Sequence, residues 1–128
     1  MKQVIHIYGA SGSGTSTLGR AIGETLGFTW LDSDNYFWLP TNPPYTAKRG
    51  IAERLNAMNR DIDAAENVVL SGSLTDWGDA LMPRFTLAVR VETDTPTRLT
   101  RIREREYRKF GERILPGGDM YDLQAVVI

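Results

Sequence analysis

The sequence predicts an α/β fold, a three-layer sandwich in which helices cover both faces of a central parallel sheet. Three observations support this prediction. Short apolar segments alternate with amphipathic ones along the chain, a glycine-rich turn joins the first such pair, and polar residues follow directly after the second and third apolar segments. Strands that alternate with helices form βαβ units, and the strands of such units run parallel.

The composition is that of an ordinary globular domain, and it excludes several classes of protein. The 128 residues suit one domain rather than two. The 15 Lys and Arg nearly balance the 16 Asp and Glu, which gives no reason to expect nucleic acid or an anionic membrane as a partner. No segment approaches the roughly 18 consecutive apolar residues of a membrane span. The absence of cysteine excludes disulfides and thiolate metal sites and is compatible with a reducing, cytoplasmic setting. We expect one cytoplasmic domain over residues 1–128.

The first strand and the first helix flank a turn that cannot be regular structure. Gln3–Tyr8 reads as a buried strand, and Ser16–Leu26 reads as a helix that Gly27 ends. Between them, Gly9–Gly14 contains three glycines. The apolar residues expected to pack in the core share one face of this helix: Leu18, Ala21, Ile22 and Leu26.

The middle of the chain predicts two more strands around a long helix. Phe28–Leu31 reads as the second strand, and the proline-rich residues 40–44 mark an irregular connection. Ala47–Ala65 is the clearest helix, because its apolar residues recur every three or four positions and Thr46 can cap its start. Val68–Leu70 reads as the third strand.

The last third of the chain predicts a fourth strand, a long helix and little more. Phe85–Val91 reads as the strand, and Thr95–Phe110 reads as a helix that begins at a Thr-Pro pair. After Pro116–Gly118, only Gln124–Ile128 could form a further strand or the start of a helix. We therefore expect a fold that is short at its C-terminus, and an apolar end that favours a homodimer contact or partial disorder.

The turn after the first strand has the spacing of a phosphate-binding loop. Residues 9–16 match the pattern G-x-x-x-x-G-x-[ST], in which backbone N–H groups converge on phosphate oxygens and a helix N-terminus adds partial positive charge. Ser16 stands where a hydroxyl completes the coordination of nucleotide-bound Mg²⁺. The alternative is a turn of small residues that binds nothing. The residues expected to contact phosphate are Gly9, Ser11, Gly12, Ser13, Gly14, Thr15, Ser16 and Thr17.

Thr15 departs from the usual pattern, because lysine normally occupies this position. A lysine there places a point charge on the β- and γ-phosphates, whereas threonine offers a hydroxyl donor without charge. Nucleotide binding can rely on backbone amides and Mg²⁺, but efficient phosphoryl transfer then needs a cation from another part of the chain.

The loop resembles that of the small P-loop kinases, the group of shikimate kinase, adenylate kinase and related nucleoside monophosphate kinases. Within this group the chain is most similar to adenylate-kinase-like ATPases whose loop reads GASGSGTST, with threonine in the lysine place. The resemblance covers nearly the whole chain as a pattern of elements. It implies the fold of P-loop-containing nucleoside triphosphate hydrolases, ATP with Mg²⁺ as cofactors, and a small-molecule acceptor as the second substrate.

Two aspartates follow the second predicted strand, at the edge where open α/β sheets place ligands. In shikimate-kinase-like proteins an Asp-x-Asp segment here has two functions, and the resemblance therefore assigns Asp32 to the metal and Asp34 to the acceptor. A carboxylate beside an incoming hydroxyl can also accept its proton, so Asp34 is a candidate catalytic residue. The alternative is a pair of loop aspartates that form a turn before Asn35.

Three further features have a functional and a structural interpretation each. The aromatic segment Tyr36–Trp38 either lines an acceptor pocket or packs in the core. Arg49, with Lys48, either binds an anionic acceptor or faces solvent at a helix start. Gly72, after the third strand, either lets the backbone approach the acceptor or forms a tight turn. The lone histidine, His6, is expected to be a packed polar residue rather than a catalyst.

Four arginines form one stripe along the last predicted helix, at spacings of three, four and three residues: Arg98, Arg101, Arg105 and Arg108. One interpretation is a solvated face that nearby glutamates, Glu106 among them, partly neutralise. The resemblance favours the other, a lid over about residues 98–118 whose arginines close on the phosphates. Since Thr15 removes a charge, we expect Arg101 and Arg105 to be catalytic.

The sequence thus predicts an ATP-dependent phosphotransferase that moves a γ-phosphate to a small hydroxyl or phosphate acceptor. Two alternatives stay open: a non-catalytic nucleotide-binding module, which Thr15 favours, and a P-loop NTPase without a small acceptor. The Asp-x-Asp segment and the arginine stripe favour the kinase.

Overall fold

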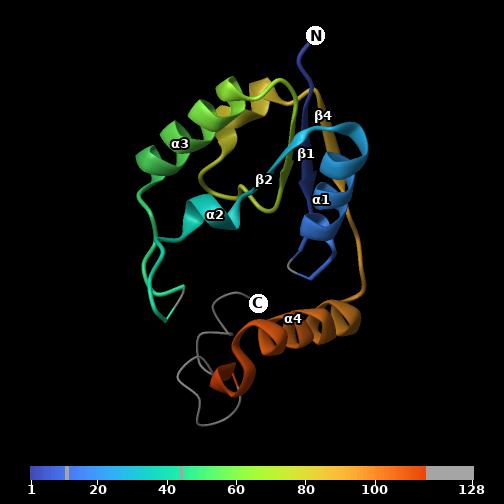
Figure 1. The fold of residues 1–128 in the computed structure, drawn as a ribbon, viewed down its shortest axis with the longest axis vertical. Helices are drawn as coiled ribbons and strands as arrows, with labels where there is room; N and C mark the ends of the chain where they lie inside the picture. The colour runs from blue at the N-terminus through green and yellow to red at the C-terminus, as the bar shows by residue number, and fades with distance from the viewer. Residues whose placement is uncertain (11, 44, 115–128) are drawn as a thin grey trace.

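A four-stranded parallel sheet forms the centre of the protein. The computed structural model describes residues 1–10, 12–43 and 45–114. The strands are β1 (Val4–Tyr8), β2 (Thr29–Asp32), β3 (Val68–Ser71) and β4 (Leu87–Arg90). Their order is β2-β3-β1-β4, and all pairings are parallel (Figure 1). The predicted parallel α/β fold is therefore confirmed.

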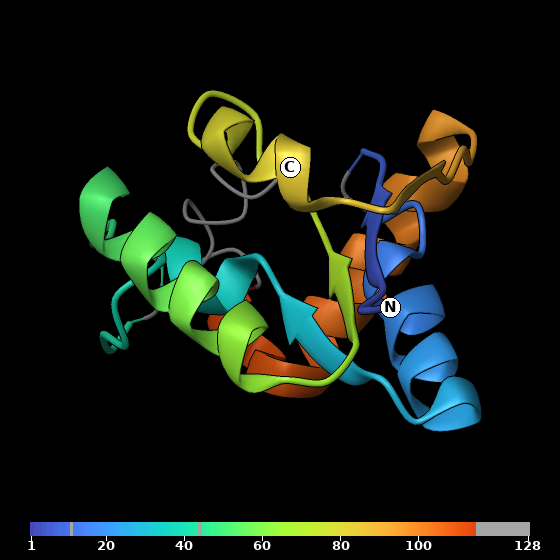
Figure 2. The same ribbon diagram turned by 90° about the horizontal axis from the view of Figure 1, so that it is seen from above.

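Helices cover the two faces of the sheet. Helix α1 (Thr15–Leu26) and helix α3 (Ile51–Ala64) lie on opposite sides of it (Figure 2). On the α3 side, Met58 and Ile62 pack with Val68 and Leu70 in the main core. The intervening β3 residues face α1 instead, because successive side chains of a strand point to opposite faces.

Helix α1 packs against the sheet through glycines, which differs from the predicted apolar face. Gly19 and Gly23 are its buried residues, whereas Leu18 is 37% and Leu26 is 56% exposed. A Cβ atom at Gly19 would lie 2.9 Å from Ser71 Cβ, so no larger residue fits without a shift. The predicted burial of Leu18, Ala21 and Leu26 is wrong, because the helix backbone, rather than its side chains, makes the close contact; Ile22 is partly buried.

The segment before α3 is a strand-like connection rather than helix. Lys48 forms an isolated antiparallel bridge with Trp38, and the N–H of Arg49 donates to Phe37 O at 2.8 Å. The helix begins at Ile51, so the predicted start at Ala47 is wrong. Thr46 does not cap it, because its hydroxyl donates to Pro43 O at 2.9 Å. A short helix, α2 (Asp34–Phe37), directly follows β2 where the sequence predicted only a connection.

Helix α4 (Thr95–Phe110) lies beyond the carboxyl ends of the strands, separate from the layers that flank the sheet (Figure 1). Asp94 caps it by accepting from the Thr97 N–H at 3.0 Å. The 3₁₀ segments η1 (Asp79–Arg84) and η2 (Gly111–Ile114) precede β4 and follow α4. No helix in the described ranges is long and apolar enough to cross a membrane. The predictions for residues 115–128, including a dimer contact, lie outside the described residues.

Candidate active site

The glycine loop between β1 and α1 has the backbone geometry that the sequence predicted. Gly12 and Gly14 adopt positive φ angles of 79° and 99°, which favour glycine. Gly14 precedes the first turn of α1, so the helix N-terminus opens onto the loop. Ser11 lies outside the described residues.

The loop is enclosed by the connection between β4 and α4 and by the first turn of α4. A Cβ at Gly9 would lie 2.4 Å from Val91 O, and one at Gly12 would lie 2.4 Å from Arg98 O. The Thr93 hydroxyl donates to Ser13 O at 3.0 Å. Two of the loop glycines are therefore required for close approach to this neighbouring segment as well as for the turn.

Ser16 and Asp32 meet at the edge of the sheet. The Ser16 hydroxyl donates to Asp32 Oδ2 at 2.8 Å, and the Asp34 N–H donates to Asp32 Oδ1 at 3.0 Å. A hydroxyl and a carboxylate are hard oxygen ligands of the kind that Mg²⁺ prefers, and this ion often keeps waters and substrate phosphates as its other ligands. The described residues hold no group of three or more acidic or histidine side chains that could bind a metal by themselves. The pair therefore fits a nucleotide-bound Mg²⁺ rather than an independent metal centre.

A pocket of about 450 Å³ begins at this pair and extends under α4. It brings together five of the predicted site residues: Ser16, Asp32, Asp34, Arg49 and Arg105. Tyr45, Glu106 and Lys109 also line it, although the sequence analysis did not select them for the site. We call this cavity the acceptor pocket.

Partial burial and neighbouring charges shift the pKa of Asp34. The residue as a whole is exposed, but the packing around its carboxyl group in the pocket raises this pKa above the usual value, and the neighbouring charge of Asp32 adds to the shift. The cations Arg105 and Lys109 act in the opposite direction. A carboxyl group with a raised pKa is a better proton acceptor once it is ionised.

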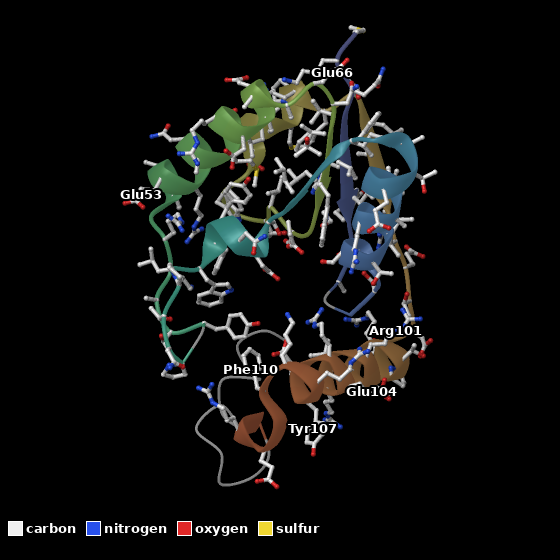
Figure 3. All side chains as sticks on the ribbon, in the orientation of Figure 1. Glu53, Glu66, Arg101, Glu104, Tyr107 and Phe110 are labelled. Atoms are coloured by element: carbon white, nitrogen blue, oxygen red, sulfur yellow. The ribbon has the colours of Figure 1, made fainter. Side chains whose placement is uncertain are left out.

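The arginine stripe divides between two places. A Cβ at Gly14 would lie 3.8 Å from Arg101 Nη1, so Arg101 reaches the glycine loop, and Figure 3 labels it on the N-terminal half of α4. Arg105 lines the acceptor pocket instead, and Arg108 is exposed. The buried face of α4 carries Ile102 and Glu106, which are 0% and 2% exposed.

Gly72 lies outside the acceptor pocket as its lining residues define it. Its φ is 107°, and a Cβ there would lie 2.0 Å from Ser33 Oγ. The His6 ring donates from Nε2 to Gly72 O at 2.9 Å, which confirms His6 as a packed polar residue. The structure thus gives Gly72 a packing role beneath Ser33, and its predicted contact with an acceptor stays a prediction.

The aromatic segment after β2 divides between the core and the pocket, and its contact with an acceptor stays a prediction. Tyr36 is buried in the core, where its hydroxyl donates to Asp61 Oδ2 at 2.6 Å. Trp38 lines the acceptor pocket, and the centroid of its ring lies 5.7 Å from the centroid of the Tyr45 ring.

One sequence signal could have identified Glu106. It lies four residues after Ile102 and therefore shares the buried face of α4. An acidic residue on a buried face is uncommon and needs a partner. Tyr45 had no comparable signal, because its place depends on an irregular proline-rich segment in which its own φ is 64°.

Comparison with known proteins identifies the family. The model of the AAA domain family matches residues 5–115. The chain belongs to this family. It is 44% identical to the uncharacterised protein YqaC of Bacillus subtilis (strain 168) over 122 residues, which cover 95% of this chain and 67% of that protein. It is 31% identical to the cytidylate kinase of Methanothrix thermoacetophila over 122 residues, which cover 87% of this chain and 68% of that enzyme.

The fold is that of the small P-loop kinases. The shikimate kinase from Acinetobacter baumannii superposes with a TM-score of 0.57 at 21% identity, over 90% of this chain and 68% of that one. The resemblance that the loop predicted is thus confirmed at the level of fold. The chain spans about two thirds of the length of each of these three proteins.

Proposed function

We propose that this protein is an ATP- and Mg²⁺-dependent phosphotransferase that moves the γ-phosphate of ATP to a small acceptor in the acceptor pocket. One observation carries the proposal. The hydrogen-bonded pair of Ser16 and Asp32 lies in the wall of the same pocket that contains Asp34 and Arg105. A metal-binding pair, a candidate base and a cation therefore surround one space at the mouth of a phosphate loop.

The loop and the pair of oxygen ligands bind the nucleotide. Backbone N–H groups of residues 9–17 hold the phosphates, and the N-terminus of α1 adds partial positive charge. Ser16 and Asp32 hold Mg²⁺, which neutralises charge on the β- and γ-phosphates. Phosphoryl transfer depends mainly on such positioning and charge stabilisation.

Asp34 serves the acceptor. When the acceptor is a hydroxyl, its oxygen forms a bond to the γ-phosphorus, the bond from that phosphorus to the β,γ-bridging oxygen breaks, and ADP leaves. The hydroxyl proton passes to the Asp34 carboxylate, whose raised pKa suits proton acceptance. A phosphate acceptor carries no such proton, and Asp34 then acts by orientation alone. Cytidylate kinase and shikimate kinase, by their names, represent these two kinds of acceptor.

Arg101 and Arg105 replace the charge that Thr15 lacks. Arg101 reaches the loop beside Gly14, and Arg105 faces the acceptor pocket. Together they flank the path from the phosphates of ATP to the acceptor. In this proposal the whole of residues 1–128 is one domain, and α4 with the residues that follow it, to about residue 118, acts as its lid.

A second candidate function is nucleotide binding without transfer, because Thr15 removes the usual cation of the loop. The experiment that separates the candidates measures ADP formation from Mg·ATP with and without a panel of small hydroxylated and phosphorylated acceptors. We expect ADP formation that requires an acceptor. Acceptor-independent ADP formation indicates an NTPase, and ATP binding without ADP formation indicates a binding module.

A matched pair of variants tests the site itself. Asp34→Asn removes the candidate base with little change in shape, and we expect transfer to a hydroxyl acceptor to fall by roughly 10²–10⁴-fold. Asp76→Asn is the control, since Asp76 is exposed, lies outside the acceptor pocket and has a φ of 70° that asparagine tolerates. Equal rates for the two variants would remove Asp34 from the mechanism.

A further inference from the structure

Arg54 is a buried arginine that pairs with no carboxylate. The residue lies in the first turn of α3 and is 6% exposed. No Asp or Glu within residues 1–10, 12–43 and 45–114 forms an ion pair with it. A buried cation is costly unless other groups match its donors and its charge. The groups that take the place of a carboxylate therefore define the role of this side chain.

A backbone oxygen and two aromatic rings take that place. Arg54 Nε donates to the backbone oxygen of Arg49 at 2.7 Å. The guanidinium carbon lies 4.2 Å from the ring centroid of Phe37 and 5.5 Å from that of Trp77, distances at which a cation is attracted to an aromatic face. The Arg49 N–H in turn donates to Phe37 O at 2.8 Å. Arg54, Arg49 and Phe37 therefore form a closed set in which each residue contacts the other two.

This set holds the base of an arm that builds one wall of the acceptor pocket. The arm consists of residues 37–43 and 45–49, which are the two strand-like segments and the turn between them. The Leu39 N–H donates to Ala47 O at 2.9 Å, so the two segments are joined to each other. A displacement of the base moves the whole wall that the arm supplies. The pocket residues of the arm are Trp38, Leu39, Pro40, Thr41, Tyr45 and Arg49.

The arm has one other polar contact with α3, and that contact is weak. Arg49 Nη1 lies 3.8 Å from Glu53 Oε2, and the Glu53 side chain is 70% exposed. Exposed ion pairs of this kind contribute little, whereas a hydrogen bond from a charged donor to a buried group is among the stronger ones. The Arg54 side chain is therefore the main polar connection between the arm and α3.

We propose that Arg54 is a positioning residue for the acceptor, which it does not touch. This inference rests on the proposed function, because it concerns the same pocket. Arg54 is not among the residues that line the pocket, whereas Arg49, whose backbone it holds, does line it. Its guanidinium also keeps Phe37, and with it Trp38, against α3. The glycine loop and the Ser16–Asp32 pair lie outside these contacts, so loss of Arg54 weakens acceptor binding and leaves nucleotide binding unchanged.

The first test compares Arg54→Met with Glu53→Gln. Methionine keeps an unbranched apolar side chain and removes the charge and the donor. With an acceptor that supports ADP formation in the panel above, Arg54→Met is expected to raise the acceptor KM by roughly tenfold or more, with kcat within about threefold of the parent. The affinity for a non-hydrolysable ATP analogue with Mg²⁺ is expected to stay the same. Glu53→Gln removes the weak contact and is expected to change neither constant.

This division between KM and kcat separates positioning from a general loss of structure. A higher KM at constant kcat indicates the loss of binding that the ground state and the transition state share. A variant that merely loses folded protein shows a lower apparent kcat at constant KM. Arg54→Lys keeps a cation near Phe37, so it is expected to recover part of the change. If Arg54→Met does not fold, Arg54→Lys is compared with the parent instead, and a smaller rise in KM is expected.

The second test is limited proteolysis without any acceptor. Trypsin cleaves after Lys48 and Arg49 at the base of the arm, and after the exposed Arg20 in α1. Cleavage of a folded protein follows local opening, so release of the arm exposes its base without exposing α1. Arg54→Met is therefore expected to speed cleavage at the base by roughly tenfold relative to cleavage at Arg20.

The outcomes distinguish this inference from the proposed function. An unchanged KM for the Arg54 variants, or an equal rise in Glu53→Gln, overturns the positioning role. Equal acceleration of cleavage at the arm and at Arg20 also overturns it, because the effect is then global. If no acceptor supports ADP formation, the proposed function fails, and proteolysis alone decides whether Arg54 holds the arm.

Discussion

Gly19→Ala is the substitution that most directly tests how α1 carries the loop and Ser16 against the sheet. Two effects of this substitution on the free energy of unfolding oppose each other. Replacing a helical glycine by alanine stabilises an isolated helix by about 1 kcal/mol. In this protein, however, the new Cβ would lie 2.9 Å from Ser71 Cβ and 3.0 Å from Trp30 Nε1. These two side chains are themselves joined by a hydrogen bond of 2.8 Å, so neither can move without cost.

The steric effect is expected to win. Overpacking of this kind costs about 1–3 kcal/mol, and weakening of the Trp30–Ser71 hydrogen bond adds about 1 kcal/mol. After the gain in helix propensity, the net loss is about 1–3 kcal/mol in the free energy of unfolding. With a urea m-value of roughly 1–3 kcal/mol/M, the midpoint of unfolding falls by about 1 M. A shift of α1 also moves Ser16 away from Asp32, so Mg²⁺-dependent nucleotide binding is expected to weaken.

Equilibrium urea unfolding followed by circular dichroism is the assay, with Gly50→Ala as the control. Gly50 has a φ of −60° and nothing within 4 Å of its Cβ position, so alanine fits there without a clash. Gly50 is the N-cap of α3, and the poorer capping by alanine opposes the stabilisation from a less flexible unfolded chain, so the midpoint is expected to change little. An unchanged or raised midpoint for Gly19→Ala, at an unchanged m-value, would refute the close packing of α1 on β2 and β3.

Four other changes test the site and the core. Ser16→Ala should weaken ATP binding in the presence of Mg²⁺ more than in its absence, as calorimetry measures; equal losses would remove Ser16 from the metal site. Thr15→Lys should tighten ATP binding, because the long side chain brings a cation to the phosphates; weaker binding would contradict a phosphate-cradling geometry of the loop. Arg101→Ala or Arg105→Ala should slow transfer by on the order of 10³, whereas the exposed Arg103→Ala should not, and comparable rates for all three would make the stripe a solvated face. Tyr36→Phe should cost about 1 kcal/mol of stability at neutral pH by removing the bond to Asp61. That bond lowers the pKa of Asp61 below its ordinary value of about 3.9, so its contribution is present above this value and is lost as the pH falls through the lower folded pKa. Urea unfolding of Tyr36→Phe and the parent should therefore converge in acid, and a gap that widens there would contradict the argument.

The sequence was sufficient to predict the sheet and the meeting of Ser16 with Asp32, because both depend on local patterns; the metal-binding role of this pair stays a prediction. Parallel strands place their carboxyl ends at one edge, so residues that follow different strands meet there. Ser16 follows the loop after β1 and Asp32 ends β2, and their hydrogen bond of 2.8 Å is the result of that rule. The same rule also places Asp34 beside them.

Other features could not be predicted, because they depend on contacts between distant segments. The apolar pattern of α1 favoured Leu18 and Leu26 as core residues, but the sheet accepts the glycine face, since only glycine lets the helix approach to this distance. The start of α3 was misplaced because residues 47–49 pair with residues 37–39 instead of forming a helical turn. Propensity favours the helix at these positions, and the tertiary pairing overrides it.

In the proposed mechanism the cation that stabilises transfer belongs to α4 and not to the glycine loop. A loop lysine is part of α1 and reaches the phosphates wherever the rest of the chain lies. Arg101 belongs to α4 instead, and α4 is held near the loop by specific contacts, the Thr93–Ser13 hydrogen bond and the close approach of Gly12 to Arg98. Under the proposed function, the charge that stabilises transfer is therefore present only when α4 lies over the loop. Phosphate binding through backbone N–H groups has no such condition, so changes in the α4 contacts should slow transfer more than they weaken ATP binding.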